Sequence, residues 1–244
     1  MRRLDAELSG LAPLLHRSIV KFAKGGAGAI ISSYVPVLME GRIIAGYATV
    51  HRDEYIPLWQ TLGEAVHSFG CKFIMQLSHS GRQMDIPGVH NYTRPALSST
   101  SRKESLHGFL CQAMSLEQID HTIRAFARGA WRAREAGLDG VELHAANGYL
   151  FTQFLSSGIN DRTDRYGGSL TNRARFLLDV IQAIRAAAAA LHLLQSMPAQ
   201  CAEESHGRYE PKRFADHAAM VEQLMTIYQA HPILRVPTPV EISP

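Results

Sequence analysis

The 244-residue sequence has little of what marks several protein classes. Its three cysteines, Cys71, Cys111 and Cys201, are odd in number and far apart, which argues against a disulfide framework and favours a reducing compartment. No apolar run approaches the roughly 20 residues that a membrane helix needs. The basic N-terminus is not followed by an apolar stretch of signal-peptide length. These absences predict a soluble, cytoplasmic protein with no membrane partner.

Charge of one sign is also scarce. The 25 Lys and Arg and the 22 Asp and Glu give a net charge of +3 and are dispersed, so no nucleic-acid partner is predicted. The twelve histidines include no i,i+4 pair and no Cys-x-x-Cys motif accompanies them, so no metal site is expected. The glycines of "KGGAGA" precede a strand-like run, whereas nucleotide loops follow a strand and open a helix. A small-molecule substrate is the expected partner.

Short apolar runs alternate with amphipathic segments along the first 185 residues. Strands are predicted at residues 29–34 and within "CKFIMQLSHSGR" and "LDGVELHAANG". Helices are predicted within "DEYIPLWQTLGEAVHSFG", from the capping-box pair Ser115 and Gln118 to Gly137, and within "LTNRARFLLDVIQAIR". This alternation predicts an α/β fold with right-handed parallel crossovers.

Two regions depart from the alternation. Residues 83–114 are rich in Ser, Pro, Gly, Asn and His and predict a long loop, a feature that often forms a lid or binding surface. After Arg185, "AAAAALHLL" predicts continued helix, and the remaining chain shows no buried strand, although a helix is plausible at residues 214–229. We therefore expect a main domain over residues 1–190 and an atypical helical or irregular tail over residues 191–244.

Polar side chains crowd the stretch "GVELHAANGYLFTQFL". The period of two along a strand puts Glu142 and His144 on one face, with His144 the last such residue before a turn. Ligands of parallel α/β sheets bind beyond the carboxyl ends of the strands. There His144 and Asn147 can each donate a hydrogen bond to one carbonyl oxygen, and the Tyr149 phenol can supply a proton.

A second strand contributes an amide at the same edge. The same period places Gln76 near the end of its strand, where the amide can both donate to and accept from the edge of a heterocycle such as a flavin pyrimidine. In the loop after the His144 strand, Arg162, Asp164 and Arg165 are expected to brace irregular backbone rather than act on a ligand.

The segment "HAANGYLFTQFLSSGINDRTDRYGGSLTNRARFLLDVI" resembles the signature of the old yellow enzyme family, the FMN-dependent NADH:flavin oxidoreductases and NADH oxidases. "GGAGAIISS" and "MQLSHSGRQ" resemble the second and third barrel strands of that family, so the likeness covers about residues 22–185. It implies a partial TIM (β/α)8 barrel with about three to four β/α units. It also implies FMN at the barrel mouth, NAD(P)H as reductant, and reduction of the activated C=C of an α,β-unsaturated carbonyl compound.

Site roles follow from the resemblance at matching positions. His144 and Asn147 would hold the substrate carbonyl oxygen, and Tyr149 would protonate the α-carbon. Gln76 would bond the flavin pyrimidine, and Ser33 would lie near the isoalloxazine. The family's first strand and last four strands, including those that cradle the FMN phosphate, are not recognised here. The resemblance therefore predicts a shortened member with weakened or lost FMN binding and with exposed sheet edges that favour self-association.

Two alternatives remain open from the sequence. The chain can be a catalytically inactive family member that serves as a binding or auxiliary protein. It can also carry out flavin-independent acid/base chemistry with the same three residues, His144, Asn147 and Tyr149.

Overall fold

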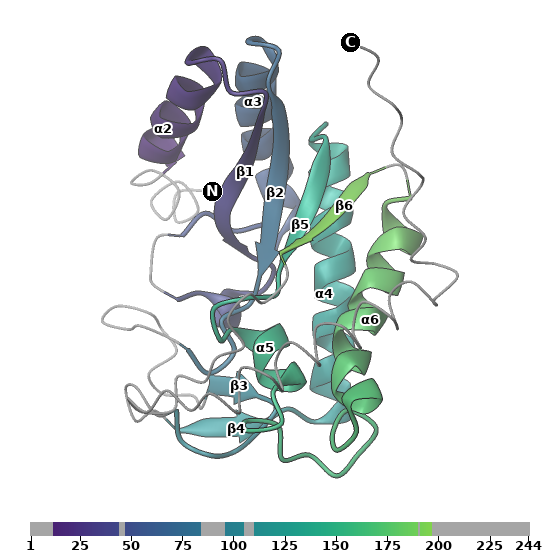
Figure 1. The fold of residues 1–244 in the computed structure, drawn as a ribbon. Coiled ribbons are helices and arrows are strands. Elements are labelled where there is room, and N and C mark those ends of the chain that lie inside the picture. The colour runs from purple at the N-terminus through teal and green to yellow at the C-terminus, as the bar shows by residue number, and fades with distance from the viewer. Residues whose placement is uncertain (1–11, 44–46, 84–95, 105–109, 190, 197–244) are drawn as a thin grey trace.

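The computed structural model describes residues 12–43, 47–83, 96–104, 110–189 and 191–196. Its centre is a parallel four-stranded sheet in the order β1-β2-β5-β6. The strand carboxyl ends point toward the bottom of Figure 1. The strands are β1 (Ala29–Pro36), β2 (Lys72–Ser78), β5 (Gly140–His144) and β6 (His192–Ser196).

Helices pack against one face of this sheet. Phe73, Met75 and Leu77 of β2 and Val141 and Leu143 of β5 are fully buried on that face, where α3 and α4 contact β2 and α4 contacts β5. The alternate residues face the other way, toward what is the interior in a closed barrel. The helices are α2 (Ala12–Lys24), α3 (Ile56–His67), α4 (Leu116–Glu135), α5 (Leu150–Leu155) and α6 (Leu170–Ala187).

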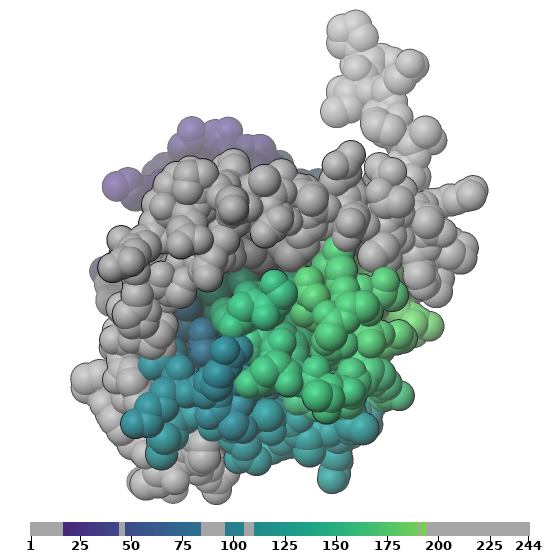
Figure 2. All heavy atoms as spheres, turned by 60° about the horizontal axis from the view of Figure 1, so that its bottom comes forward, coloured from purple at the N-terminus to yellow at the C-terminus, as the bar shows by residue number. Residues whose placement is uncertain are grey.

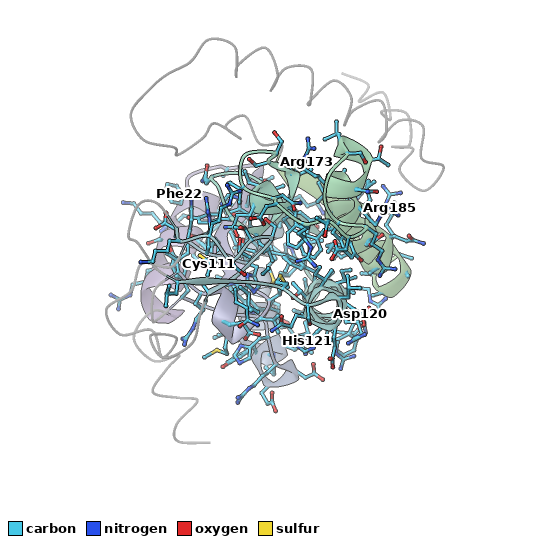
Figure 3. All side chains as sticks on the ribbon, turned by 90° about the horizontal axis from the view of Figure 1, so that it is seen from below. Phe22, Cys111, Asp120, His121, Arg173 and Arg185 are labelled. Atoms are coloured by element: carbon cyan, nitrogen blue, oxygen red, sulfur yellow. The ribbon has the colours of Figure 1, made fainter. Side chains whose placement is uncertain are left out.

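The first and last described helices, α2 and α6, lie at opposite ends of the layer of helices (Figure 3). In Figure 3, Phe22 of α2 and Arg185 of α6 lie on opposite sides of the molecule, while α4 and α6 pack against each other.

Among the described residues, no helix has the length and apolar character that crossing a membrane requires.

Several sequence predictions are confirmed at single-residue detail. Ser115 and Gln118 form the predicted capping box, each side chain bonding the backbone N–H of the other at 3.1 and 2.8 Å. The helix it opens is closed by Gly137, which adopts a positive φ of 73° that favours glycine. The three predicted strands and the helices between them are all present.

The helix predicted to continue through "AAAAALHLL" is wrong. The helix α6 ends at Ala187, and residues 192–196 form a fourth strand that pairs with β5 from Gly140 to His144. Leu191 and Leu193 pack against the hydrophobic core, so tertiary burial overrides the helix propensity of the alanine run. The segment predicted as a tail from residue 191 therefore begins with a strand of the central sheet, and the predicted helix at residues 214–229 lies outside the described residues.

The long loop predicted between residues 83 and 114 is partly wrong. Its described parts contain a small parallel ladder of β3 (Ala96–Ser98) and β4 (Cys111–Ala113). This ladder and α5 lie below the carboxyl ends of the central strands in Figure 1. The short strands cover that end of the sheet, where the candidate site residues lie.

Strand β1 contains a bulge that the sequence did not reveal. The pairing moves from Ile31 opposite Ile74 to Tyr34 opposite Gln76, so two residues of β1 lie where β2 supplies one. The hydroxyl of Ser32 stabilises this irregularity, because it accepts from the backbone N–H of Gln76 at 2.8 Å and donates to the Ser33 carbonyl at 2.8 Å. As a result Tyr34, rather than Ser33, shares the face of Gln76.

Candidate active site

The candidate site lies where the carboxyl ends of β2 and β5 meet α5. Figure 2 looks toward this end and shows blue atoms from the end of β2 beside teal and green atoms from α5 and α6. The backbone N–H of Leu150, the first residue of α5, donates to the carbonyl of His79 just after β2 at 3.1 Å. The two segments that carry the motif are therefore held together by backbone contacts.

His144 ends β5 as predicted and is only 8% exposed. Its Nδ1 is buried and has no hydrogen-bond partner among the described residues. Burial lowers the pKa of this imidazole, so the ring is neutral at neutral pH and offers one N–H donor. A neutral imidazole at the end of a strand can donate its one N–H to an oxygen atom of a ligand.

Tyr149 is brought directly beside His144. The two ring centroids are 4.9 Å apart and the ring planes are perpendicular, at 89°. The turn between them places Asn147 at a left-handed φ of 56°, a conformation that asparagine tolerates better than most residues, followed by Gly148 at 72°. Tyr149 is half-buried and Asn147 is exposed on the same turn, so the three predicted residues lie at the end of β5 and on the turn that follows it.

Gln76 and Ser33 differ in how the structure places them. Gln76 is half-buried on the site face, and its amide donates to the carboxylate of Glu142 at 2.9 Å. The oxygen of the Gln76 side-chain amide and the second N–H of that amide have no partner among the described residues. Ser33 is exposed beside the bulge, and its position opposite Gln76 is taken by Tyr34.

Tyr34 is a site residue that the sequence analysis missed. Its ring contacts those of Tyr149 and His144, with centroid distances of 5.3 and 5.9 Å. Its hydroxyl donates to the Gly41 carbonyl at 2.6 Å. Burial, followed by the nearby Tyr149, raises the pKa of Tyr34 well above its ordinary value. No local signal predicts this placement, because it depends on the bulge.

Gln153 of α5 was also missed and holds the motif turn in place. Its buried side chain donates to the carbonyls of Ser80 and Gly148 at 3.0 and 2.8 Å. The same amide accepts from the backbone N–H of Arg82 and from the hydroxyl of Ser98 at 3.1 and 3.0 Å. One side chain thus connects the end of β2, strand β3 and the turn that carries Tyr149.

The loop after α5 is braced as predicted. Arg162 pairs with the Asp164 carboxylate through two nitrogens, at 3.1 and 2.5 Å, and donates to the Met114 carbonyl at 2.6 Å. The hydrogen bond from Arg162 lowers the pKa of Asp164. The described residues contain no cluster of three or more side chains suited to a metal ion.

A parallel sheet flanked by helices, with an imidazole, a phenol and amides at the carboxyl ends of its strands, is the arrangement of the α/β-barrel class of folds. A model of the NADH:flavin oxidoreductase / NADH oxidase family matches residues 14–240. The chain belongs to this family, which confirms the resemblance seen in the sequence. The match continues well past the predicted domain boundary at residue 190.

Curated relatives agree with this assignment. The chain is 39% identical over 166 residues to an NADH oxidase of Thermoanaerobacter brockii, covering 68% of this chain and 25% of that protein. It is 37% identical over 174 residues to an NADPH dehydrogenase of Bacillus pumilus, covering 71% of this chain and 50% of the relative. The chain thus spans half or less of the length of these relatives.

Solved structures confirm the partial TIM-barrel fold. An old yellow enzyme from Pichia sp. AKU4542 is similar with a TM-score of 0.69 and 27% identity, over 86% of this chain and 59% of that one. A morphinone reductase in complex with tetrahydroNAD is similar with a TM-score of 0.65 and 30% identity, over 74% and 54% of the two chains.

Proposed function

We propose that this chain is an FMN-dependent NAD(P)H oxidoreductase that reduces the activated C=C of an α,β-unsaturated carbonyl compound. The observation that carries the proposal is the perpendicular pair of His144 and Tyr149 at the carboxyl end of β5. One member is a neutral hydrogen-bond donor with a buried, unpaired nitrogen, and the other is a half-buried phenol. Such a pair suits a substrate that needs its carbonyl polarised and its α-carbon protonated.

Each residue has a distinct role in this proposal. His144, assisted by Asn147 on the same turn, donates to the carbonyl oxygen and stabilises the negative charge that develops there. Tyr149 gives its proton to the α-carbon. Tyr34 is unsuited to that step, because its hydroxyl already donates to Gly41.

The residues present fit the ring of a flavin. Bound FMN, reduced by NAD(P)H, would supply the hydride that reaches the β-carbon. Gln76 would hold the pyrimidine edge, because its amide oxygen and second N–H remain available beside Glu142. The resemblance assigns the phosphate cradle to the seventh and eighth strands of the barrel, and the sheet of the described residues has four strands. FMN held by the described residues alone should therefore bind weakly.

The names of the relatives, NADH oxidase and NADPH dehydrogenase, support NAD(P)H as the reductant. A cytoplasmic location and a small-molecule substrate belong to the same proposal. The second candidate function is a catalytically inactive relative with a binding or auxiliary role. Acid/base chemistry without flavin at the same residues is a third.

Colour and turnover separate these functions. FMN titrated into the purified protein, without a desalting step, should show a saturable shift of its yellow absorbance, and the mixture should consume NADPH or NADH only when an enone is added. Tyr149→Phe should retain FMN binding and lose about 10²- to 10⁴-fold in turnover, because a positioned proton donor typically accelerates a reaction by about that factor. Tyr55→Phe, a buried tyrosine outside the site, is the control. An unshifted flavin absorbance at every FMN concentration would contradict the proposal and favour the two alternatives.

A further inference from the structure

Tyr34 contacts the residues of the proposed mechanism without a chemical role in it. Its ring meets those of Tyr149 and His144 edge to face, at interplanar angles of 70° and 71°. The side chain comes from β1, while His144 and Tyr149 come from the end of β5 and the turn that follows. A third ring, that of Tyr47, lies 5.4 Å from the Tyr34 ring. Tyr34 is therefore distant in the sequence from His144 and Tyr149, and its ring contacts the rings of both.

The hydroxyl of Tyr34 is tied to a rigid point of the backbone. It donates to the Gly41 carbonyl at 2.6 Å, and the same oxygen accepts from the N–H of Ser80 at 3.0 Å. Gly41 packs so closely on His79 that an added Cβ would lie 2.8 Å from its ring. The anchor therefore has little freedom to shift.

The main chain of Tyr34 is fixed as firmly. Tyr34 pairs with Gln76 directly after the bulge, and the Ser32 hydroxyl bonds the Gln76 N–H that the bulge leaves open. Tyr34 is only 6% exposed. With backbone and hydroxyl both held, the ring has one orientation available.

We propose that Tyr34 is a positioning residue that holds the His144 imidazole and the Tyr149 phenol perpendicular to each other, so that both address one substrate. A reacting group is effective only within about 0.5 Å and 10–20° of its productive geometry. A misplacement of about 1 Å can cost about 10²-fold in rate. The catalytic consequence rests on the proposed function, whereas the packing of the three rings does not.

Two substitutions and a matched control test the proposal. Tyr34→Leu removes the ring and the anchor, and Tyr34→Phe keeps the ring and removes only the bond to Gly41. Tyr55 offers the control, because it is a buried tyrosine, 3% exposed, whose ring contacts a different histidine, His51, at 5.2 Å. Tyr55→Leu and Tyr55→Phe make the same chemical changes outside the site.

The first measurement needs no activity and no flavin. The ring signals of His144 are followed by proton–carbon NMR and assigned from their loss in His144→Gln. Tyr34→Leu should move the His144 signals, and Tyr34→Phe should move them less. The Tyr55 variants should move only the signals of His51. The second measurement is enone-dependent NADPH consumption, where Tyr34→Leu should lower kcat about 10- to 100-fold and change KM little.

The outcomes are decisive in both directions. A folded Tyr34→Leu protein with unmoved His144 signals would overturn the proposal, and so would an unchanged kcat. If Tyr34→Leu does not fold, Tyr34→Phe decides by the same NMR signals. If the unsubstituted protein shows no turnover with FMN, the proposed function fails while the NMR result still decides whether Tyr34 positions the two rings.

Discussion

Replacing Gln153 with Met should destabilise the protein more than any exposed substitution of the same kind. The Gln153 side chain is fully buried and makes four hydrogen bonds, two through its oxygen and two through its nitrogen. Methionine has a similar length and cannot replace any of the four. The carbonyls of Ser80 and Gly148 would lose a donor, the first of them in a fully buried position.

The expected loss follows from these contacts. A typical hydrogen bond contributes about 0.5–1.5 kcal/mol net, so four contribute about 2–6 kcal/mol, and stranded buried partners push the loss toward the upper end. A domain of ordinary stability has about 5–15 kcal/mol in total. We therefore expect Gln153→Met to remove a large fraction of the free energy of unfolding.

Urea denaturation followed by circular dichroism measures this loss. Gln60→Met is the matched control, because Gln60 is exposed on α3 and its side chain bonds only Glu64, one turn along the same helix. The control should change stability by less than about 0.5 kcal/mol. A loss below about 1 kcal/mol in Gln153→Met would refute the reasoning that this amide connects the segments of the site.

Two further predictions concern acid stability and association. Burial raises the pKa of Asp139, but hydrogen bonds from Lys72, the Phe73 N–H and His67 outweigh it and lower the pKa from 3.8 to about 2. Because the folded-state pKa is the lower one, the carboxylate stabilises the protein above the unfolded pKa, and this stability is lost as pH falls from about 4 to about 2. Urea midpoints over that range should fall more in the unsubstituted protein than in Asp139→Asn, where the lowered pKa of Asp164 still contributes a loss, and parallel curves would contradict the prediction. Among the described residues β1 pairs only with β2 and β6 only with β5, and Ile31 of β1 is 46% exposed, so we expect self-association through the sheet edges. Light scattering should detect this self-association, and Ile31→Lys should reduce it. Phe22→Lys on α2 is the control and should leave it unchanged. A monomer at every concentration would count against the prediction.

Local patterns in the sequence predicted the parts of the fold that local interactions determine. The capping box at Ser115 requires only two side chains three residues apart, and the sequence displays it directly. The position of His144 at the end of β5 follows from an apolar run that stops at a small-residue turn. Tyr149 lies five residues further on, so any tight turn brings it near. These features need no knowledge of the remaining chain.

The missed features all depend on contacts between distant segments. The bulge in β1 places Tyr34 opposite Gln76, on the face of the site, and the sequence analysis did not predict this. A bulge depends on how two strands register, and the sequence of one strand does not reveal it. Strand β6 was missed for a similar reason, because its alanine-rich approach favours helix until β5 offers an edge for pairing.

Under the proposed function, the geometry of the site and the binding of FMN are separable. His144, Tyr149, Tyr34 and Gln153 all lie on β1, β5, α5 or the turn before α5, so the described strands and helices are sufficient to orient the groups that would meet a carbonyl substrate. The phosphate cradle is assigned by resemblance to other strands. A protein can therefore hold its proton donor and carbonyl donor correctly and still turn over slowly, because it binds FMN weakly. Raising the FMN concentration should then restore turnover in the unsubstituted protein but not in Tyr149→Phe, since added cofactor compensates for weak binding and not for a missing proton.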